Sequence, residues 1–406
     1  MEEKMKFREI GKRNIGTAAL ILCMLVSVFF AYAGREDLSK IDVLFVTLPI
    51  VPLFVILALA GIFCAVGLFL RGMKIDIVCV LLLVRLILHC VPLISDGIHA
   101  KFAVNFVTSG LCLAFYWLGL NYSRDKHFLL KAVKLIFLLI TLQTVLEAFL
   151  GDVTFFGSTY DYKNDLILPF GGSNAIAAIL IPCFAYIFCA EKRWSMCIPY
   201  TVLLLFVIVL TKSRGGLIVA LCALCLAVLF RLRISVRRML IFGAAGAVLA
   251  GLLIALLIVT PWGSYVFLNS SSTVFGRFTL WEEHLTYFAQ SPFFGFGFAA
   301  ETVTNNPHNF IVHILSRSGV LGLELAGILG GCAVMKLYGA FRDKYVRAGI
   351  CFLVCMMCHS LVEIVLFSYN YDMIFWFVLG GTVSRAALVK AQTEAVNAAV
   401  TVRNND

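Results

Sequence analysis

Residues 202–230 read VLLLFVIVLTKSRGGLIVALCALCLAVLF, two apolar runs joined by one short polar turn. Each run, with its flanking residues, is close to the roughly 20 residues that a helix needs to cross the hydrocarbon core of a bilayer. The turn carries Lys212, Ser213 and Arg214 and then two glycines, which favour a chain reversal. The stretch therefore predicts two antiparallel membrane-spanning helices, over 195–211 and 215–230.

The rest of the chain repeats this pattern. Of its 406 residues 61% are hydrophobic and 14% are charged, and the mean hydropathy is +0.97. Soluble domains are about 45–50% apolar and about 25% charged. We predict an all-α polytopic membrane protein with about twelve spans. The remaining spans are expected at 15–33, 43–70, 75–94, 101–120, 127–149, 173–190, 239–260, 318–337, 346–367 and 371–389.

We expect one integral membrane domain over 1–390. Two extracytoplasmic loops, at about 150–172 and 261–306, exceed ordinary connector length. The tail over 391–406 is polar, and we expect it to be cytoplasmic and disordered.

The distribution of charge orients this bundle. If the N-terminus is cytoplasmic, most of the 33 Lys and Arg residues fall in cytoplasmic segments, as the positive-inside rule requires. The basic residues form short collars, so the net charge of +10 requires no nucleic acid. All 14 cysteines lie in predicted spans, which argues against a disulfide framework. We expect a protein of the cytoplasmic membrane with both termini inside and its active site outside.

Arg214 lies at the outer turn between two predicted spans. Its planar fork of N–H donors suits a phosphate, and the glycines after it allow close approach of a ligand. The alternative is an interfacial arginine that extends its charge into water. Lys212 is about 200° away around a helix, so it points elsewhere, and a solvated residue at the membrane boundary is the simpler interpretation.

Arg277 is the basic residue of the second long loop. The spacing of Phe278, Trp281, Leu285 and Phe288 predicts an amphipathic helix that lies on the bundle and turns Arg277 inward. The alternative is a surface arginine paired with a neighbouring glutamate.

Residues 305–310 read NNPHNF and precede another span. Asn306 can cap that helix and Pro307 suits its first position, which would place His308 and Asn309 in the first turn. The N–H groups there form an anion site, and the positive helix end favours a neutral imidazole that can accept a proton. The alternative is a histidine in a capping turn with no chemistry. Arg317 faces the opposite side of this helix and is of secondary interest.

Two further pairs lie inside predicted spans. Arg85 and His89 are four residues apart, as are His359 and Glu363, so each pair shares a helix face. Buried ion pairs that fix helix packing are the simpler interpretation. A line of titratable groups would also suit a proton-coupled transporter.

Soluble-enzyme motifs and clusters of metal-binding carboxylates are absent from the sequence. We therefore expect chemistry without a metal or a cofactor.

Several motifs occur together and in order. Residues 291–298, SPFFGFGF, are followed by NNPHNFIVHILSRSGVLGL over 305–323, and they are preceded by GGSNAIAAIL (171–180), TKSRGG (211–216) and GRFTLWEEHL (276–285). This combination resembles the C-terminal signature of the O-antigen ligase and polysaccharide polymerase family. The resemblance covers roughly 170–330.

The resemblance implies a membrane glycosyltransferase of the cell envelope that uses an undecaprenyl-diphosphate-linked glycan as donor. Arg214 and Arg277 would bind the diphosphate leaving group, and His308 would deprotonate or orient the acceptor hydroxyl. Transfer would invert the anomeric carbon and need no metal. The acceptor would be a lipid or wall component for a ligase, which we favour, and another repeat unit for a polymerase; a glycan flippase is a further alternative. Additional substrate contacts are expected from Ser213, Gly215, Lys212, Asn309 and Arg317.

Overall fold

The computed structural model describes residues 40–43, 46–49, 74–96, 100–122, 126–150, 166–168, 171–232, 241, 271–298, 307–361, 363, 366 and 372–405. Its helices are α3 (Ile77–Cys90), α4 (Leu93–Asp96), α5 (Ala100–Tyr122), α6 (Lys126–Leu150), α8 (Ser173–Ala190), η1 (Trp194–Met196), α9 (Ile198–Leu210), α10 (Arg214–Arg231), α13 (Ser271–Gln290), α14 (Phe310–Leu337), α15 (Lys344–His359) and α16 (Asp372–Asn405). Two short antiparallel pairs join β1 (Lys40–Val43) to β2 (Val46–Pro49) and β3 (Ile167–Leu168) to β4 (Gly171–Gly172).

Among the described residues, four helical segments are long and apolar enough to cross a membrane: His127–Phe149, Ser173–Ala190, Phe310–Leu337 and Asp372–Thr401. Three shorter apolar helices accompany them, at Ile77–Cys90, Trp194–Leu210 and Val219–Arg231. The predicted spans 15–33 and 239–260 lie outside the described residues, apart from Ile241, so a total of about twelve stays a prediction. The predicted span 43–70 is wrong at its start, because Val46–Pro49 is a strand.

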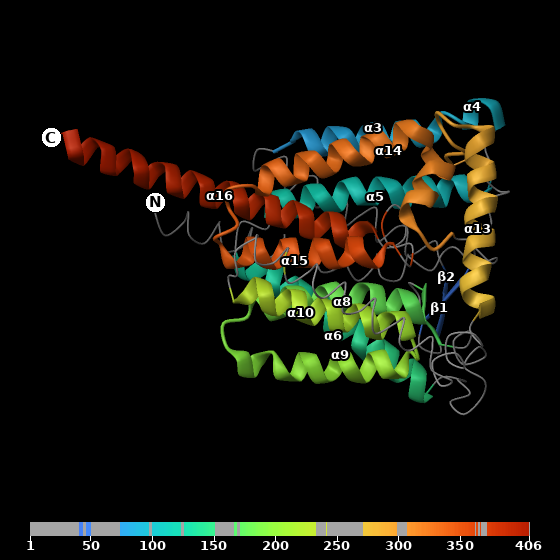
Figure 1. Ribbon diagram of the computed structural model, residues 1–406, viewed down its shortest axis with the longest axis horizontal. Coiled ribbons are helices and arrows are strands. Elements are labelled where there is room, and N and C mark those ends of the chain that lie inside the picture. The colour runs from blue at the N-terminus through green and yellow to red at the C-terminus, as the bar shows by residue number, and fades with distance from the viewer. Residues whose placement is uncertain are drawn as a thin grey trace.

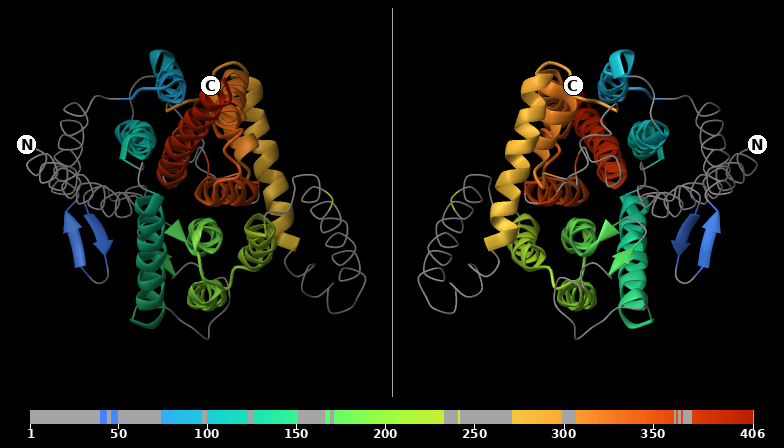
Figure 2. Two further views of the ribbon diagram at one scale, coloured as in Figure 1. Left: turned by 90° about the vertical axis from the view of Figure 1, so that its left-hand side faces the viewer. Right: turned by 90° about the vertical axis from the view of Figure 1, so that its right-hand side faces the viewer.

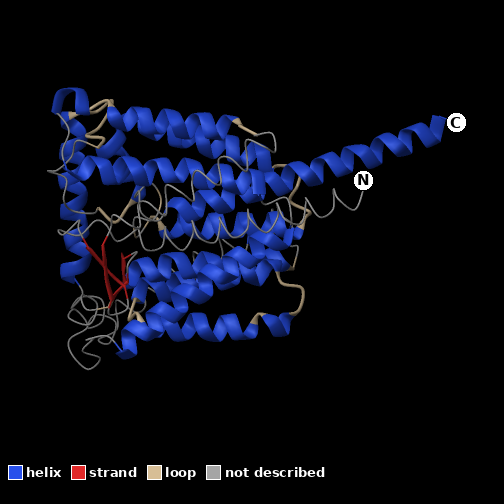
Figure 3. Cartoon of the chain, turned by 180° about the vertical axis from the view of Figure 1, so that it is seen from behind, coloured by secondary structure: helices blue, strands red, loops and turns tan. Residues whose placement is uncertain are grey.

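The helices lie side by side in two groups, and α13 crosses one end of them (Figure 1). The end view in Figure 2 shows α3, α5, α14 and α16 in one group and α6, α8, α9 and α10 in the other. Helix α15 lies between the groups and packs against both α8 and α16. Figure 3 shows from behind that the bundle is helical, with the strands confined to the end that α13 covers.

Helix α8 is the centre of the second group and contacts α6, α9, α10 and α15. Its sequence is apolar on every face, which is the pattern of a helix enclosed by protein. All of its residues are buried except Asn174, in its first turn. The helix therefore presents one polar side chain at the end of the bundle that α13 crosses.

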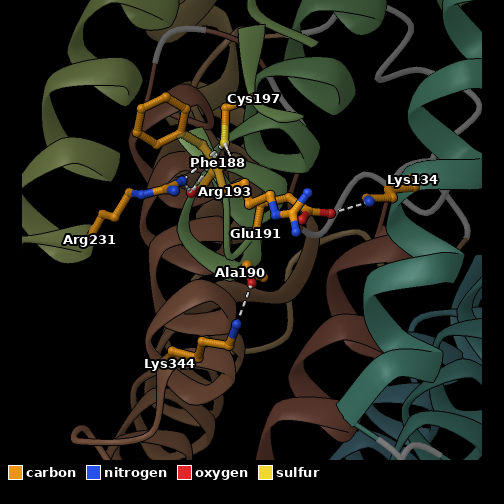
Figure 4. Close-up of polar contacts among 8 residues, drawn as sticks. All are labelled: Lys134, Phe188, Ala190, Glu191, Arg193, Cys197, Arg231 and Lys344. Atoms are coloured by element: carbon orange, nitrogen blue, oxygen red, sulfur yellow. Dashed lines mark hydrogen bonds and ion pairs between the residues drawn. The ribbon is translucent and has the colours of Figure 1, made fainter. Parts of the chain in front are cut away.

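Basic side chains gather at the opposite end of α8 (Figure 4). Arg231 donates to the carbonyl of Phe188 at 2.5 Å, Lys344 donates to the carbonyl of Ala190 at 3.0 Å, and Lys134 pairs with Glu191. Cations are favoured there because the last carbonyls of a helix carry partial negative charge. The two ends of the bundle are therefore chemically different.

Helix α14 is broken at Gly319, which has φ 62° and ψ −161°. The loop over 291–298 fills the break: Val320 N–H donates to the carbonyl of Pro292 at 2.8 Å, and Gly297 N–H donates to the carbonyl of Arg317 at 2.7 Å. A Cβ on Gly319 would lie 2.3 Å from the carbonyl of Phe293. The glycines of the signature motif therefore join a loop to a discontinuous helix.

Helix α16 corrects another expectation. The tail over 391–406 was expected to be disordered, yet the helix continues to Asn405 and projects beyond the bundle (Figure 1). Residues 385–405 contain no Gly or Pro and are rich in Ala, a strong helix former. Local propensity therefore extends the last span into a helix whose exposed part is polar.

Candidate active site

The site begins at the N-terminus of α14, where Asn309 rather than Asn306 is the capping residue. The Oδ1 atom of Asn309 accepts hydrogen bonds from the N–H groups of Ile311 at 3.0 Å and Val312 at 3.2 Å. The prediction that His308 lies in the first turn is wrong, because it precedes the cap. The N–H groups of Ile311 and Val312, at the observed start of the helix, are therefore bonded to the cap rather than open to an anion. Asn306 itself lies outside the described residues.

His308 adopts a left-handed backbone with φ 50°, and Lys212 does the same with φ 48°. Such conformations are uncommon for residues other than glycine and cost energy that the surrounding structure must supply. Lys212 directly precedes Ser213, the cap of α10. Both strained residues therefore stand immediately before the cap of a helix that begins at the same end of the bundle.

The side chain of His308 contacts the carboxylate of Glu363, a pairing that the sequence did not predict. Its Nδ1 lies 2.8 Å from Oε1 of Glu363, and the exposed fractions of the two side chains are 30% and 12%. We had expected Glu363 to pair with His359 within one long helix. Instead α15 ends at His359, because the Ser360 hydroxyl bonds to the carbonyl of Met356 and accepts the N–H of Leu366.

The Glu363 carboxylate also belongs to a chain of hydrogen bonds that leads to α8 and α10. Oε2 of Glu363 accepts from Nδ2 of Asn174 at 2.9 Å, and Oδ1 of Asn174 accepts from the Ser213 hydroxyl at 3.0 Å. Ser213 Oγ also accepts the N–H of Gly216 at 3.1 Å, which caps α10. We call His308, Glu363, Asn174 and Ser213 the polar relay. It joins the start of α14 to the starts of α8 and α10.

The arginines predicted to bind the donor lie on two helices, α10 and α13. Arg214 and Gly215 are the first two residues of α10, directly after the Ser213 cap. Arg277 is half-buried on α13. Arg317 lies at the break in α14, where its Nη1 is 3.4 Å from the carbonyl of Gly297. The structure therefore associates Arg317 with the loop over 291–298 rather than with the relay.

Helix α13 confirms the predicted amphipathic helix but not its buried face. Phe278 and Leu285, expected to pack on the bundle, are 54% and 45% exposed. His284 is buried instead, with its Nδ1 2.8 Å from the hydroxyl of Ser316. Trp281 donates from Nε1 to the carbonyl of Pro307 at 2.6 Å. The helix is therefore held against the segment that carries His308.

The other predicted pair, Arg85 and His89, stays on one helix, but its two members bind different partners. Arg85 binds Asp372 of α16, with Nη1 and Nη2 each 3.2 Å from the same carboxylate oxygen, Oδ2. His89 Nε2 lies 2.5 Å from the hydroxyl of Ser318 at the break in α14. Both contacts hold α3 to neighbouring helices. The residues grouped as a transporter site therefore have different partners.

Sequence reasoning missed Asn174 and the pairing of Glu363. Asn174 was visible as a polar residue at the start of an apolar span. The pairing had no signal in the sequence, because 55 residues separate His308 from Glu363 and 189 separate Asn174 from Glu363.

Comparison with known proteins bears directly on this geometry. Residues 199–327 match the family model described as O-Antigen ligase, Wzy_C. This segment belongs to the O-antigen ligase family. The O-antigen ligase segment covers about a third of the chain and contains Ser213, Arg214, Arg277 and His308. No curated protein sequence matches the chain.

The match supports a membrane protein of the ligase and polymerase type, acting on lipid-linked glycans. Asn174 and Glu363 lie outside the matched segment, although they bond to residues within it. The relay therefore joins the O-antigen ligase segment to α8 before it and to Glu363, which follows the end of α15, after it.

Proposed function

We propose that this protein transfers a glycan from an undecaprenyl-diphosphate carrier to an acceptor hydroxyl at the outer surface of the cytoplasmic membrane. The observation that carries the proposal is the polar relay. Polar side chains are costly in an apolar bundle and mark functional sites. Here they connect His308 to the turn that carries Arg214, both in the O-antigen ligase segment.

The reaction requires one base and a stabilised leaving group. The acceptor oxygen attacks the anomeric carbon, the bond from that carbon to the diphosphate breaks, and the configuration inverts. His308 takes the hydroxyl proton. Arg214 and Arg277 hold the charge that develops on the lipid diphosphate, which departs as the second product. This balance requires neither a metal nor a redox cofactor.

The outward orientation rests on charge. The relay lies at one end of the bundle, and Lys134, Arg231 and Lys344 bind around α8 at the other end (Figures 1 and 4). Under the positive-inside rule the second end is cytoplasmic. We favour a ligase, with a repeat-unit polymerase as the alternative; the identity of the acceptor decides between them.

The test is transfer by the purified protein in liposomes, with an undecaprenyl-diphosphate oligosaccharide as donor and a series of lipid and glycan acceptors, with and without EDTA. His308→Ala should lower kcat by about 10²–10⁴-fold and Arg214→Ala by about 10²–10³-fold. His127→Ala and Arg193→Ala are matched controls, because both residues are exposed, Arg193 lies at the opposite end of the bundle (Figure 4), and His127 contacts Tyr345 in the first turn of α15, beside Lys344.

Transfer that survives EDTA and is lost in the two site variants, but not in the controls, would support the proposal. Full activity of His308→Ala would refute the assigned base. Donor that crosses the bilayer without transfer to any acceptor would replace the proposal with a flippase.

A further inference from the structure

We infer that Glu363, oriented by Asn174, is the positioning residue that makes His308 a base. The inference rests on the proposed function, because it assigns a role within that reaction. It extends the site beyond the O-antigen ligase segment, since both residues lie outside 199–327.

The first step is the hydrogen on His308. An ionised carboxylate only accepts hydrogen bonds, so Oε1 of Glu363 at 2.8 Å requires that Nδ1 of His308 carry the hydrogen. A neutral imidazole has one N–H, so Nε2 is then the nitrogen that accepts the proton of the acceptor hydroxyl. Glu363 thereby selects the tautomer, and its negative charge stabilises the imidazolium that forms, as in other histidine–carboxylate pairs.

The second step is the orientation of Glu363. Its Oε2 accepts from Nδ2 of Asn174, whose own Oδ1 is fixed by the hydroxyl of Ser213. The hydroxyl bond therefore orients the amide, so that its NH₂ group faces the carboxylate. A carboxylate held at both oxygens keeps one geometry toward the imidazole.

The third step is the position of Ser213. It caps α10, and its hydroxyl orients Asn174, so the next residue after the group that orients Asn174 is Arg214. The group that orients the base is therefore one residue from a group proposed to bind the diphosphate. This arrangement fixes the base relative to the leaving group through three side chains.

Glu363→Gln tests the role with little change of shape. The amide group of the new side chain would donate to Nδ1 of His308 and place the ring hydrogen on Nε2, where it blocks the base. We expect kcat to fall by about 100-fold or more. The donor KM should stay within about threefold, because the diphosphate contacts remain. Glu363→Asp should have a higher kcat than Glu363→Gln, because it keeps the negative charge on a shorter side chain.

Two further variants isolate the mechanism. Asn174→Ala should lower kcat by about 10-fold or more, as removal of an orienting partner does in other sites. The double variant His308→Ala with Glu363→Gln should be no slower than His308→Ala alone, because Glu363 acts through the histidine. Glu394→Gln, an exposed glutamate of α16 beyond the bundle, is the control for loss of a carboxylate.

The outcomes separate the two proposals. If His308→Ala is inactive while Glu363→Gln keeps the wild-type kcat, the inference is overturned and the proposed function stands. Losses that multiply in the double variant would also overturn it, because Glu363 would then act independently of His308. An active His308→Ala variant would refute both the inference about Glu363 and the proposed function with His308 as its base. If Glu363→Gln does not fold, Asn174→Ala decides, and a wild-type kcat for it would refute the relay.

Discussion

The break in α14 makes a strong prediction about Gly319. Its backbone, at φ 62° and ψ −161°, lies in a region that is essentially restricted to glycine. An added Cβ would lie 2.3 Å from the carbonyl carbon and oxygen of Phe293. Gly319→Ala must therefore either strain the backbone or push the loop over 291–298 away from the helix.

The cost follows from these contacts. The backbone conformation costs an alanine roughly 1–3 kcal/mol. Displacing the loop weakens the hydrogen bonds from Val320 N–H to Pro292 O at 2.8 Å and from Leu321 N–H to Phe293 O at 3.3 Å. Each contributes roughly 0.5–1.5 kcal/mol. Together these terms predict a loss of roughly 2–6 kcal/mol in stability.

The same helix provides a matched control. Gly327 lies in the regular part of α14, and a Cβ added there would meet nothing within 4 Å. Gly327→Ala should therefore stabilise the helix by roughly 0.5–1 kcal/mol. We would compare thermal unfolding of the two variants in detergent, with transfer activity measured alongside. Equal unfolding temperatures for the two variants would refute the structural role of the break.

Three further predictions concern contacts away from this break. Arg85→Ala and Asp372→Ala should each lower the free energy of unfolding by about 3–5 kcal/mol, because each leaves a buried charge without its partner. The double variant should lose less stability than the sum of the two single variants, and additive losses in thermal unfolding would contradict this. Burial alone would raise the pKa of Asp343, but the Arg385 guanidinium and backbone N–H groups outweigh it and lower that pKa from 3.8. The stabilisation of the fold by the Asp343–Arg385 ion pair is therefore present above pH 3.8 and is lost as pH falls below it. The difference in unfolding free energy between wild type and Asp343→Asn should shrink below pH 3.8, and a constant difference in pH-dependent unfolding would refute the ion pair. Trp281→Phe removes a 2.6 Å hydrogen bond to the segment carrying His308 and should lower kcat without changing donor KM, and an unchanged kcat would show that the bond does not position the base.

Local features of the fold were predictable. The span predicted at 173–190 coincides with α8, and α13 lies where apolar spacing predicted an amphipathic helix. Errors arose at helix ends. Asn309 caps α14 in place of Asn306, and Ser360 ends α15 early, because in each case a polar side chain competes for backbone groups. Run length and periodicity do not record that competition.

Run length, composition and motif order are properties of single stretches of chain, so they were enough to predict a membrane-spanning helical bundle, its charge asymmetry and the arginine and histidine motifs. The hydrogen-bond partners of these side chains could not be predicted in this way. Glu363 reaches His308 because α15 ends at His359, and Asn174 meets both Glu363 and Ser213 because α8, α10 and α14 all begin at one end of the bundle. Such pairings depend on where distant helices end, which no local pattern records.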